Sequence, residues 1–135
     1  MNELKELIKK HEGLRLKPYI CSAGKLTIGY SRNLEDKGIS EHEADMMLES
    51  DIDLAKQDLF SVFGNAANHM SQNRFNALVD MRFNLGLSRF RGFKKMIKAI
   101  KVGDWDEASK QALDSRWAEQ VKSRAIRDAL LLKEG

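Results

Sequence analysis

The segment HEGLRLKPYICSAGKLTIGY, residues 11–30, decides how the first part of this chain folds. It reads as the end of a short helix, then a polar stretch with glycine that doubles back, then a strand. Eight residues separate Glu12 from Cys21, and five separate Cys21 from Thr27. A helix end followed by a hairpin can bring a carboxyl, a thiol and a hydroxyl to one point in space. The spacing therefore predicts a functional site at the edge of a cleft.

Hydrophobic periodicity and capping residues predict one helix before this segment and five helices after it. Residues 14–34 between them are rich in Tyr, Ile and Thr and are punctuated by glycine and proline, which predicts a small hairpin or three short strands. Ser40 and Glu43 have the spacing of a capping box. The expected helices cover about residues 2–11, 40 to 60 or 63, 71–86, 93–101, 104 onward, and 122–133. This order predicts an α+β fold.

The bulk composition fits one soluble globular domain. The chain has 135 residues, of which 42% are hydrophobic and 32% charged. No apolar run approaches the roughly 18 residues that a membrane span needs. The N-terminal stretch MNELKELIKKHEG is polar and amphipathic, unlike a signal peptide, so nothing in it directs the chain out of the cell. Cys21 is the single cysteine, which excludes an internal disulfide.

Positive charge gathers in the last third of the chain. Residues 88–135 hold 12 Lys and Arg against 7 Asp and Glu, whereas residues 1–87 hold 11 against 13. The basic group includes Arg89, Arg91, Lys94, Lys95, Lys98 and Lys101. Such a surface favours a polyanion, such as nucleic acid, an anionic membrane or a bacterial cell wall, but it is also typical of a solvated helix face.

The order and spacing of residues 12–30 resemble the motif of the phage-type lysozymes, glycoside hydrolase family 24. Two later segments are also similar to this family. Residues 74–86, RFNALVDMRFNLG, resemble its inter-lobe helix, and residues 104–127 resemble its Ser-Arg-Trp helix pair followed by Arg-Ala-x-Arg. The resemblance covers nearly the whole chain. It implies a lysozyme-like domain of residues 1–135, with a small N-terminal sheet lobe and a larger helical C-terminal lobe joined by a long helix.

The resemblance also implies the site residues. Glu12 would be the general acid, and Thr27 would orient the attacking water. Phe83 and Asn84 would line the saccharide cleft. Asn33 would lie on the opposite lip, and Arg124 would pair with Glu12. The alternative for Arg124 is a solvated cation on a helix face, and the alternative for Phe83 is core packing. For Trp117 we expect packing in the core. No metal ion and no cofactor are implied.

Two positions depart from the family pattern. Cys21 stands where the family has an Asp that positions the attacking water and offsets positive charge at the anomeric carbon. A thiol with a pKa of about 8.5 is mostly neutral at pH 7 unless its surroundings lower that value. Three readings of Cys21 are therefore open: a thiolate that replaces the Asp, a residue that positions the attacking water, or a small residue without a chemical role. Ser31-Arg32 replaces Gly-His, and Arg32 is expected to pair with an acid in place of that His.

The function implied is that of an endolysin, a peptidoglycan hydrolase that cleaves the β-1,4 bond between N-acetylmuramic acid and N-acetylglucosamine and lyses the cell. A site with one carboxylate also resembles lytic transglycosylases, which leave 1,6-anhydro ends. A catalytically weak cell-wall-binding module is a further alternative. A nucleic-acid binder would need exposed aromatic residues among the basic ones, and these are lacking.

The expected partner is the glycan strand of peptidoglycan, without nucleic acid and without stable membrane insertion. We expect a monomer that accumulates in the host bacterial cytoplasm. It would reach the wall after a separate holin-like protein permeabilises the membrane.

Overall fold

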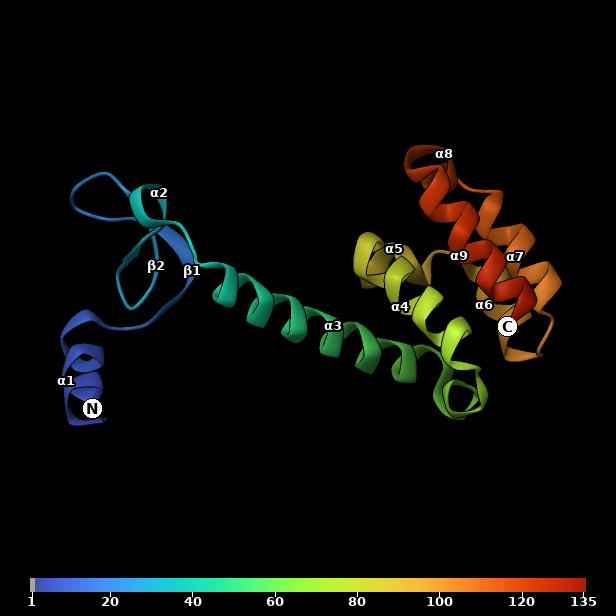
Figure 1. Ribbon diagram of the computed structural model, residues 1–135, viewed down its shortest axis with the longest axis horizontal. Coiled ribbons are helices and arrows are strands. Elements are labelled where there is room, and N and C mark those ends of the chain that lie inside the picture. Colours follow the sequence, from blue (N-terminus) through green and yellow to red (C-terminus); the bar gives the residue numbers. More distant parts are fainter. Residues whose placement is uncertain (1) are drawn as a thin grey trace. The chain divides into compact units, whose positions relative to one another are not determined.

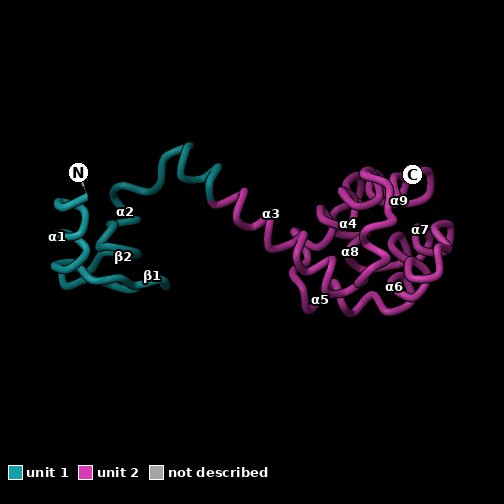
Figure 2. The backbone as a smooth tube through the Cα atoms, turned by 90° about the horizontal axis from the view of Figure 1, so that it is seen from below, with its two compact units in different colours: residues 1–46 teal, residues 47–135 magenta. Residues whose placement is uncertain are grey.

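The computed structural model describes residues 2–135, and it confirms the α+β class: helices with one small antiparallel sheet (Figure 1). Two compact units divide the chain, residues 1–46 and residues 47–135 (Figure 2). They correspond to the sheet lobe and the helical lobe that the sequence predicts. That the two units work as one domain stays a prediction.

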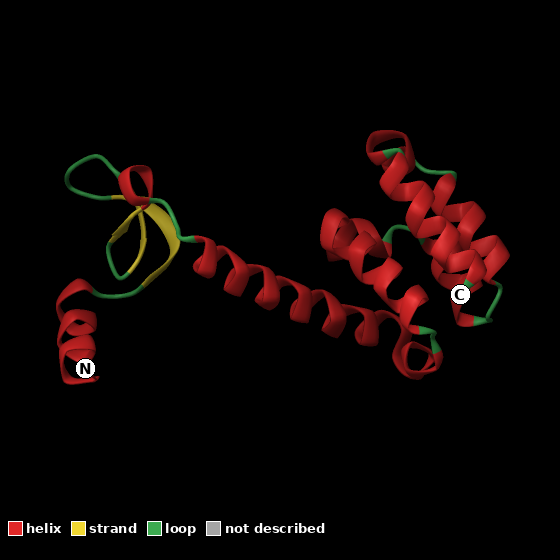
Figure 3. Ribbon diagram, viewed as in Figure 1, coloured by secondary structure: helices red, strands yellow, loops and turns green. Residues whose placement is uncertain are grey.

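Unit 1 contains the sheet, two short helices and the first residues of a long third helix (Figure 3). Its elements are α1 (Asn2–Glu12), β1 (Arg15–Ile20), β2 (Leu26–Gly29), β3 (Arg32–Asn33), α2 (Leu34–Lys37) and the start of α3 (Glu41–Phe63). The strands are antiparallel in the order β1-β2-β3. The first predicted helix and the predicted three short strands are both confirmed.

The end of α1 sets where the chain enters the sheet. The N–H of Gly13 donates to the Lys9 carbonyl at 2.9 Å, and Gly13 has a φ of +71°. A residue with a side chain rarely adopts this left-handed conformation, so glycine suits the position after the helix. Glu12 is consequently the last helical residue before the chain turns into β1.

The edge strand β1 is irregular opposite β2. Arg15 pairs with Gly29 and Tyr19 with Thr27, so four residue steps on β1 face two on β2. Pro18 lies within this bulge, where the lack of a backbone N–H costs no ladder hydrogen bond. Beyond the bulge, regular pairing fixes Thr27 beside the end of the hairpin.

The helix α3 begins with the predicted capping box. The N–H of Glu43 donates to Ser40 Oγ at 3.1 Å, and the N–H of Ser40 donates to Glu43 Oε1 at 2.9 Å. The short α2 just before it was not predicted. It begins at Asn33, whose side chain accepts from the Asp36 N–H.

Unit 2 is helical. After α3 it holds the 3-10 helix η1 (Gly64–His69) and α4 (Gln72–Leu85), α5 (Leu87–Arg91), α6 (Lys94–Lys101), α7 (Trp105–Leu113), α8 (Arg116–Val121) and α9 (Ser123–Glu134). Ser71 caps α4 and Asp104 caps α7, as predicted. The sequence did not predict α5 and α8. No helix within residues 2–135 combines the length and the apolar character needed to cross a membrane.

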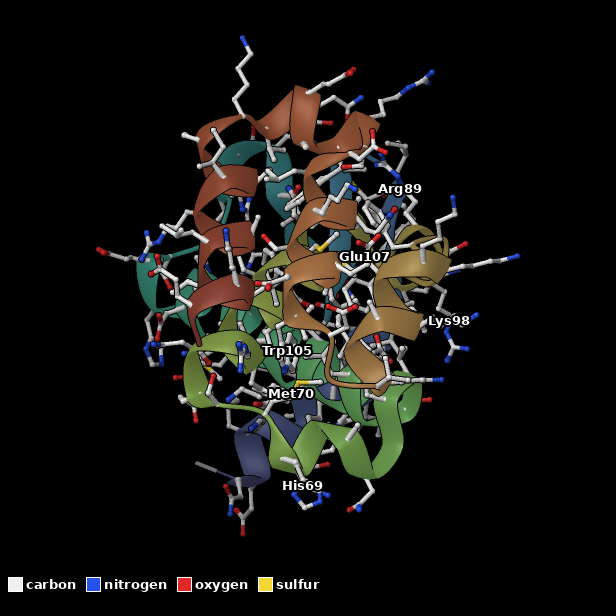
Figure 4. The ribbon with its side chains drawn as sticks, turned by 90° about the vertical axis from the view of Figure 1, so that its right-hand side faces the viewer. His69, Met70, Arg89, Lys98, Trp105 and Glu107 are labelled. Atoms are coloured by element: carbon white, nitrogen blue, oxygen red, sulfur yellow. The ribbon has the colours of Figure 1, made fainter. Side chains whose placement is uncertain are left out.

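The core of unit 2 lies between α4, α7 and α9, with α5 and α6 closing it. Its largest fully buried side chains are Leu59, Leu78, Met81, Phe90, Met96 and Leu132. Trp117 is 3% exposed and joins this core, which confirms its predicted packing role. Met70 and Trp105, labelled in Figure 4, are partly buried against the same cluster.

Arg74 ties three helices together at one end of this core. Its Nε donates to the Leu132 carbonyl at 2.8 Å and its Nη2 to the Lys133 carbonyl at 3.2 Å. Its guanidinium also lies 4.4 Å from the centre of the Trp105 ring. Arg74 therefore satisfies carbonyl groups at the end of α9 from the start of α4, while stacking on the start of α7.

Candidate active site

The tip of the β1–β2 hairpin fixes Cys21. Its N–H donates to the Lys25 carbonyl at 2.9 Å, and its own carbonyl accepts from the Gly24 N–H at 2.9 Å. Gly24 has a φ of +77°, a left-handed conformation in which a side chain would be strained. The turn is therefore closed on both sides of Cys21, and the thiol is held half-buried at the hairpin tip.

Thr27 is anchored to the same backbone carbonyl. Its side chain is buried, at 2% exposure, and its Oγ1 donates to the Lys25 carbonyl at 2.8 Å. Lys25 thus accepts from the backbone of Cys21 and from the hydroxyl of Thr27. The structure brings these two predicted site residues together, while their chemical roles stay predictions.

The surroundings of Cys21 favour its thiolate. The backbone N–H of Lys25, followed by the Thr27 hydroxyl and the backbone N–H of Ala23, lowers the pKa of the Cys21 thiol, and partial burial opposes this only weakly. Thr27 has a single hydroxyl proton, which the Lys25 carbonyl also accepts, so the two backbone amides are the constant donors. Hydrogen bonds to the charged form stabilise it, and Cys21 is consequently a stronger acid than a free cysteine.

Glu12 lies at the other end of the hairpin. It is exposed at the end of α1, and the pairing of Arg15 with Gly29 sets the start of β1 opposite the end of β2. Thr27 precedes Gly29 by two residues, about 7 Å along an extended strand. The topology places Glu12 just before the hairpin that carries Cys21 and Thr27. Its role as general acid stays a prediction.

Asn33 has a local task that the sequence analysis missed. Its Oδ1 accepts from the Asp36 N–H at 3.1 Å, and its Nδ2 donates to Asp36 Oδ2 at 2.9 Å. Both ends of the amide are engaged in starting α2. An Asn followed three residues later by Asp is a recognisable helix-start signal. The expected contact of Asn33 with saccharide stays a prediction.

Arg32 pairs with an acid, as expected. Its two terminal nitrogens donate to the two carboxylate oxygens of Glu43 on α3. Its Nη1 also donates to the Gly38 carbonyl at 3.2 Å. Together with the Ser40 N–H, Arg32 lowers the pKa of Glu43 to about 2, its own hydrogen bonds being the larger cause. This ion pair fixes β3 against the start of α3.

In unit 2, Phe83 and Arg124 lie on one hollow of about 470 Å³. Its remaining lining residues are Leu48, Ile52, Lys56, Asn76, Val79 and Asp80. Phe83 is 39% exposed, so part of its ring is free to contact a ligand. An exposed aromatic ring beside a guanidinium suits a sugar, which has both apolar faces and hydroxyl groups.

Arg124 has a partner that the sequence analysis did not identify. Its Nε donates to Asp80 Oδ2 at 2.9 Å and its Nη2 to Asp80 Oδ1 at 2.7 Å. This two-armed geometry is the strong form of an arginine–carboxylate pair. Asp80 interrupts an apolar part of α4, which is the one sequence signal that it makes a specific contact. The expected pairing of Arg124 with Glu12 stays a prediction.

Asn84 does not line the hollow that contains Phe83. Its Oδ1 accepts from the indole Nε1 of Trp117 at 2.8 Å. Trp117 meets the ring of Phe93 edge-on, with the ring centres 6.4 Å apart. Asn84 is thereby fixed by a core residue while it stays exposed, and its contact with saccharide stays a prediction.

The basic surface of unit 2 lies on α5 and α6. Figure 4 labels two of its members, Arg89 and Lys98, and both are exposed. Lys94 and Lys95 are also exposed on α6, whose opposite side is buried. The surface fits either a polyanion or solvent. Within residues 2–135, no three His, Cys, Asp or Glu side chains are grouped so that they could hold a metal ion.

A family model described as phage lysozyme matches residues 9–130 of the chain. The endolysin of Acyrthosiphon pisum secondary endosymbiont phage 1 is 33% identical over 116 residues, covering 83% of this chain and 75% of its own. The probable T4-type lysozyme 2 of Dictyostelium discoideum is 26% identical over 163 residues, covering 100% of this chain and 96% of its own. The pre-baseplate central spike protein Gp5 of Enterobacteria phage T4 is 27% identical over 157 residues. That match covers 96% of this chain but only 27% of the spike protein.

Proposed function

Because the chain belongs to the phage lysozyme family, we propose that it hydrolyses the β-1,4 bond between N-acetylmuramic acid and N-acetylglucosamine in peptidoglycan. Family membership makes it an enzyme, a glycoside hydrolase that acts on peptidoglycan. The bond and the residue roles are our proposal. The observation that carries them is the hairpin tip, where Cys21 and Thr27 share the Lys25 carbonyl.

Glu12 is the proposed general acid. Cleavage of a glycosidic bond requires a proton on the leaving oxygen, because an unprotonated alkoxide leaves too slowly. Glu12 is the carboxyl group of the motif, and it lies three positions before Arg15, the first residue of the strand that pairs with β2. In this proposal it gives its proton to the glycosidic oxygen and recovers one from solvent after the product departs.

Cys21 is proposed to act as a thiolate in place of the family Asp. The transition state of the reaction carries positive charge on the anomeric carbon and ring oxygen. A thiolate offsets this charge, whereas a neutral thiol does so poorly. The backbone amides of Lys25 and Ala23, which stabilise the thiolate and lower the pKa of Cys21, support this role.

Thr27 is proposed to orient the attacking water. Its hydroxyl proton is directed to the Lys25 carbonyl, so the oxygen lone pairs are free to accept a hydrogen bond from water. Burial of the side chain and the hydrogen bond hold this acceptor in one position. A water fixed beside the thiolate attacks the anomeric carbon, and its proton passes to bulk solvent.

We propose that glycan contacts Phe83, Asn84 and Arg124 in unit 2 and Asn33 in unit 1. Phe83 offers an exposed ring for the apolar face of a sugar, and Arg124 offers hydrogen-bond donors next to it. Asn84 offers its free amide nitrogen because the indole of Trp117 engages only its oxygen. Asn33 is the weakest member, since Asp36 engages both ends of its amide.

Mass spectrometry of muropeptides tests the reaction. Purified peptidoglycan is incubated with the protein and with Glu12→Gln, and the glycan ends are identified. Hydrated reducing ends on N-acetylmuramic acid, absent with Glu12→Gln, support the proposal. Anhydro ends would support a transglycosylase, and unchanged glycan would support a wall-binding module. Either of these results overturns the hydrolase proposal.

In the cell, we propose that the protein accumulates as a monomer in the bacterial cytoplasm and lyses the wall after a holin-like protein opens the membrane. Expression in a Gram-negative host tests this. Turbidity should fall only when a membrane-permeabilising agent is added, and light scattering should give the mass of one chain. Lysis without the agent would overturn the requirement for a holin-like protein.

A further inference from the structure

Asp128 is a buried acid without an obvious task. It lies on α9, is 4% exposed, and its Oδ2 has no hydrogen-bond partner among residues 2–135. An ionised carboxylate buried without a donor is strongly disfavoured. A bound proton removes the charge and turns the acid into a hydrogen-bond donor. The surroundings of Asp128 should therefore reveal an acceptor for that donor.

The acceptor that the surroundings offer is Asp80 on α4, which lines the same hollow as Asp128 and is its hydrogen-bonding neighbour. The charged groups that act on Asp128 are Asp80, together with Arg124 and Arg127 from α9 itself. From α7, the polar neighbour of this part of α9 is the Ser109 hydroxyl, which donates to the Ala129 carbonyl and does not titrate in this range. Asp80 is thus the group whose charge most directly depends on Asp128.

The two acids are held in opposite states. Hydrogen bonds from Arg124 lower the pKa of Asp80, so Asp80 stays ionised. Burial, and then the neighbouring Asp80, raise the pKa of Asp128 to about 8. Two neighbouring carboxyl groups whose surroundings shift their pKa values in opposite directions can share one proton at neutral pH.

The Asp80–Arg124 pair separates two hollows on unit 2. One, of about 590 Å³, contains Asp128 and Arg127, and the other contains Phe83. Asn76, Asp80 and Arg124 line both. Asp128 therefore acts on the guanidinium beside Phe83 in two ways, through the carboxylate of Asp80 and directly through its own charge.

We propose that Asp128 is a positioning residue for Arg124: it shares one proton with Asp80, and the presence of this proton sets how the Asp80 carboxylate holds the guanidinium beside Phe83. With the proton bound, Asp128 donates to Asp80 and draws part of its charge away from Arg124. When the proton leaves, two negative charges face the same guanidinium and Asp128 loses its hydrogen bond. Arg124 then changes its hydrogen-bond geometry.

The pH range follows from the direction of the shift. The proton on Asp128 is present at neutral pH and is lost as the pH rises through about 8. The proposal depends on the proposed function in one respect only, which is that Arg124 contacts the substrate. It makes a separate statement about the structure, namely that Arg124 senses the proton on Asp128.

NMR of the intact chain tests this statement without any activity assay. The Nε–Hε signal of Arg124 is followed from pH 6 to pH 9.5 in the wild type, in Asp128→Asn and in the control Glu134→Gln, which changes an exposed acid on the same helix. An amide resembles the protonated acid in shape and cannot titrate. We expect a shift of the Arg124 signal with a midpoint near pH 8 in the wild type and the control, and none in Asp128→Asn. A signal independent of pH in the wild type, or an unchanged titration in Asp128→Asn, overturns the proposal.

The second test measures KM and kcat on soluble peptidoglycan fragments at different pH values. We expect the KM of the wild type to change by about threefold between pH 7 and pH 9, the size typical of altering one half-exposed ion pair, and the KM of Asp128→Asn to stay constant. The value of kcat should follow the same pH profile in both proteins, because neither residue touches the reacting atoms. If NMR shows the Asp128-dependent shift while KM does not respond, the positioning role for substrate fails. If no fragment is cleaved at any pH, the proposed function fails, and the NMR arm still decides whether Arg124 senses Asp128.

Discussion

Cys21 and Thr27 are joined through one acceptor, the carbonyl of Lys25, which receives the backbone N–H of the first at 2.9 Å and the hydroxyl of the second at 2.8 Å. The backbone of Cys21 and the hydroxyl of Thr27 are therefore both fixed by the turn. A substitution at either residue changes the chemistry of the pair, while the other residue keeps its hydrogen bond to the Lys25 carbonyl. This independence makes single substitutions informative.

Substitution of Cys21 by Asp should retain or increase lysis. An Asp, with an ordinary pKa of about 3.9, is ionised at neutral pH without help from backbone amides. Activity of the variant should extend to lower pH than that of the wild type, whose thiolate is lost as the pH falls below the lowered pKa of Cys21. Initial lysis rates from pH 4 to pH 9 measure the difference.

Substitution of Cys21 by Ala should lower the rate on the order of a hundredfold, if loss of the thiolate resembles loss of other charge-stabilising groups. Cys21→Ser is the matched control, because its hydroxyl stays neutral and should be nearly as slow. Full activity of the Ala variant would instead favour the transglycosylase route. An adduct of sugar on Cys21, detected by intact mass, would indicate a covalent retaining mechanism.

Glu12→Gln should abolish wall lysis while the fold is retained. The amide keeps the shape of the side chain but cannot donate the proton, and loss of a general acid costs about a hundredfold or more. Clearing of permeabilised Gram-negative cells measures the rate. Glu3→Gln, an exposed acid on the same helix, should lyse as fast as the wild type. Rapid lysis by the Glu12 variant would remove Glu12 from the mechanism.

The Arg32–Glu43 pair should contribute stability that depends on pH. Glu43 has a folded pKa of about 2, depressed from 4.5 mainly by Arg32. Its contribution is present above pH 4.5 and is lost as the pH falls towards 2. Denaturant unfolding of the wild type and Glu43→Gln at a series of pH values checks this. The difference between the two should shrink below pH 4.5, and a constant difference would contradict the assignment.

Trp117 should be more important for stability than for binding. Trp117→Phe removes the hydrogen bond to Asn84 and part of the core contact, and we expect a loss of about 1–2 kcal/mol. Trp117→Ala should cost about 3–5 kcal/mol because it leaves a cavity. Denaturant unfolding measures both values. Asn84→Ala is the companion variant, and it should weaken glycan binding more than it lowers stability.

The lysines of α6 should aid adsorption to the wall without joining the chemistry. Replacing Lys94, Lys95 and Lys98 by Gln should weaken binding mainly at low ionic strength, since charges on an exposed surface are screened beyond about 8 Å at physiological salt. Sedimentation with purified walls over a salt series measures binding. The same three positions changed to Arg should bind like the wild type. Equal binding by all three proteins would leave this surface as a solvated helix face.

Long elements with caps could be predicted from the sequence, whereas very short ones could not. The capping signals at Ser40, Ser71 and Asp104 are local, and each is followed by enough turns to show helical periodicity. Helices α2, α5 and α8 have four to six residues, barely more than one turn. Such segments show no period, and their stability comes from caps and from packing on the rest of the unit.

The site residues that could be predicted are likewise those whose signals are local in the sequence. The motif identifies the hairpin with Cys21 and Thr27 because its members are close in sequence. The partner of Arg124 is 44 positions away on another helix, and nothing in the local sequence selects Asp80 over Glu12. Asp128 was missed because its property is burial, which only the packing of α9 against α4 creates.

Arg74 has a consequence for the order in which unit 2 assembles. Its hydrogen bonds join positions 58 and 59 residues apart, so the Arg74 side chain at the start of α4 finds these partners only once α9 has docked. Closure over such a distance makes the helices of unit 2 interdependent, and they should unfold together. Hydrogen exchange should therefore show one level of protection for the buried amides of α4, α7 and α9. Arg74→Ala should lower that protection in all three helices at once, including those far from the substituted residue.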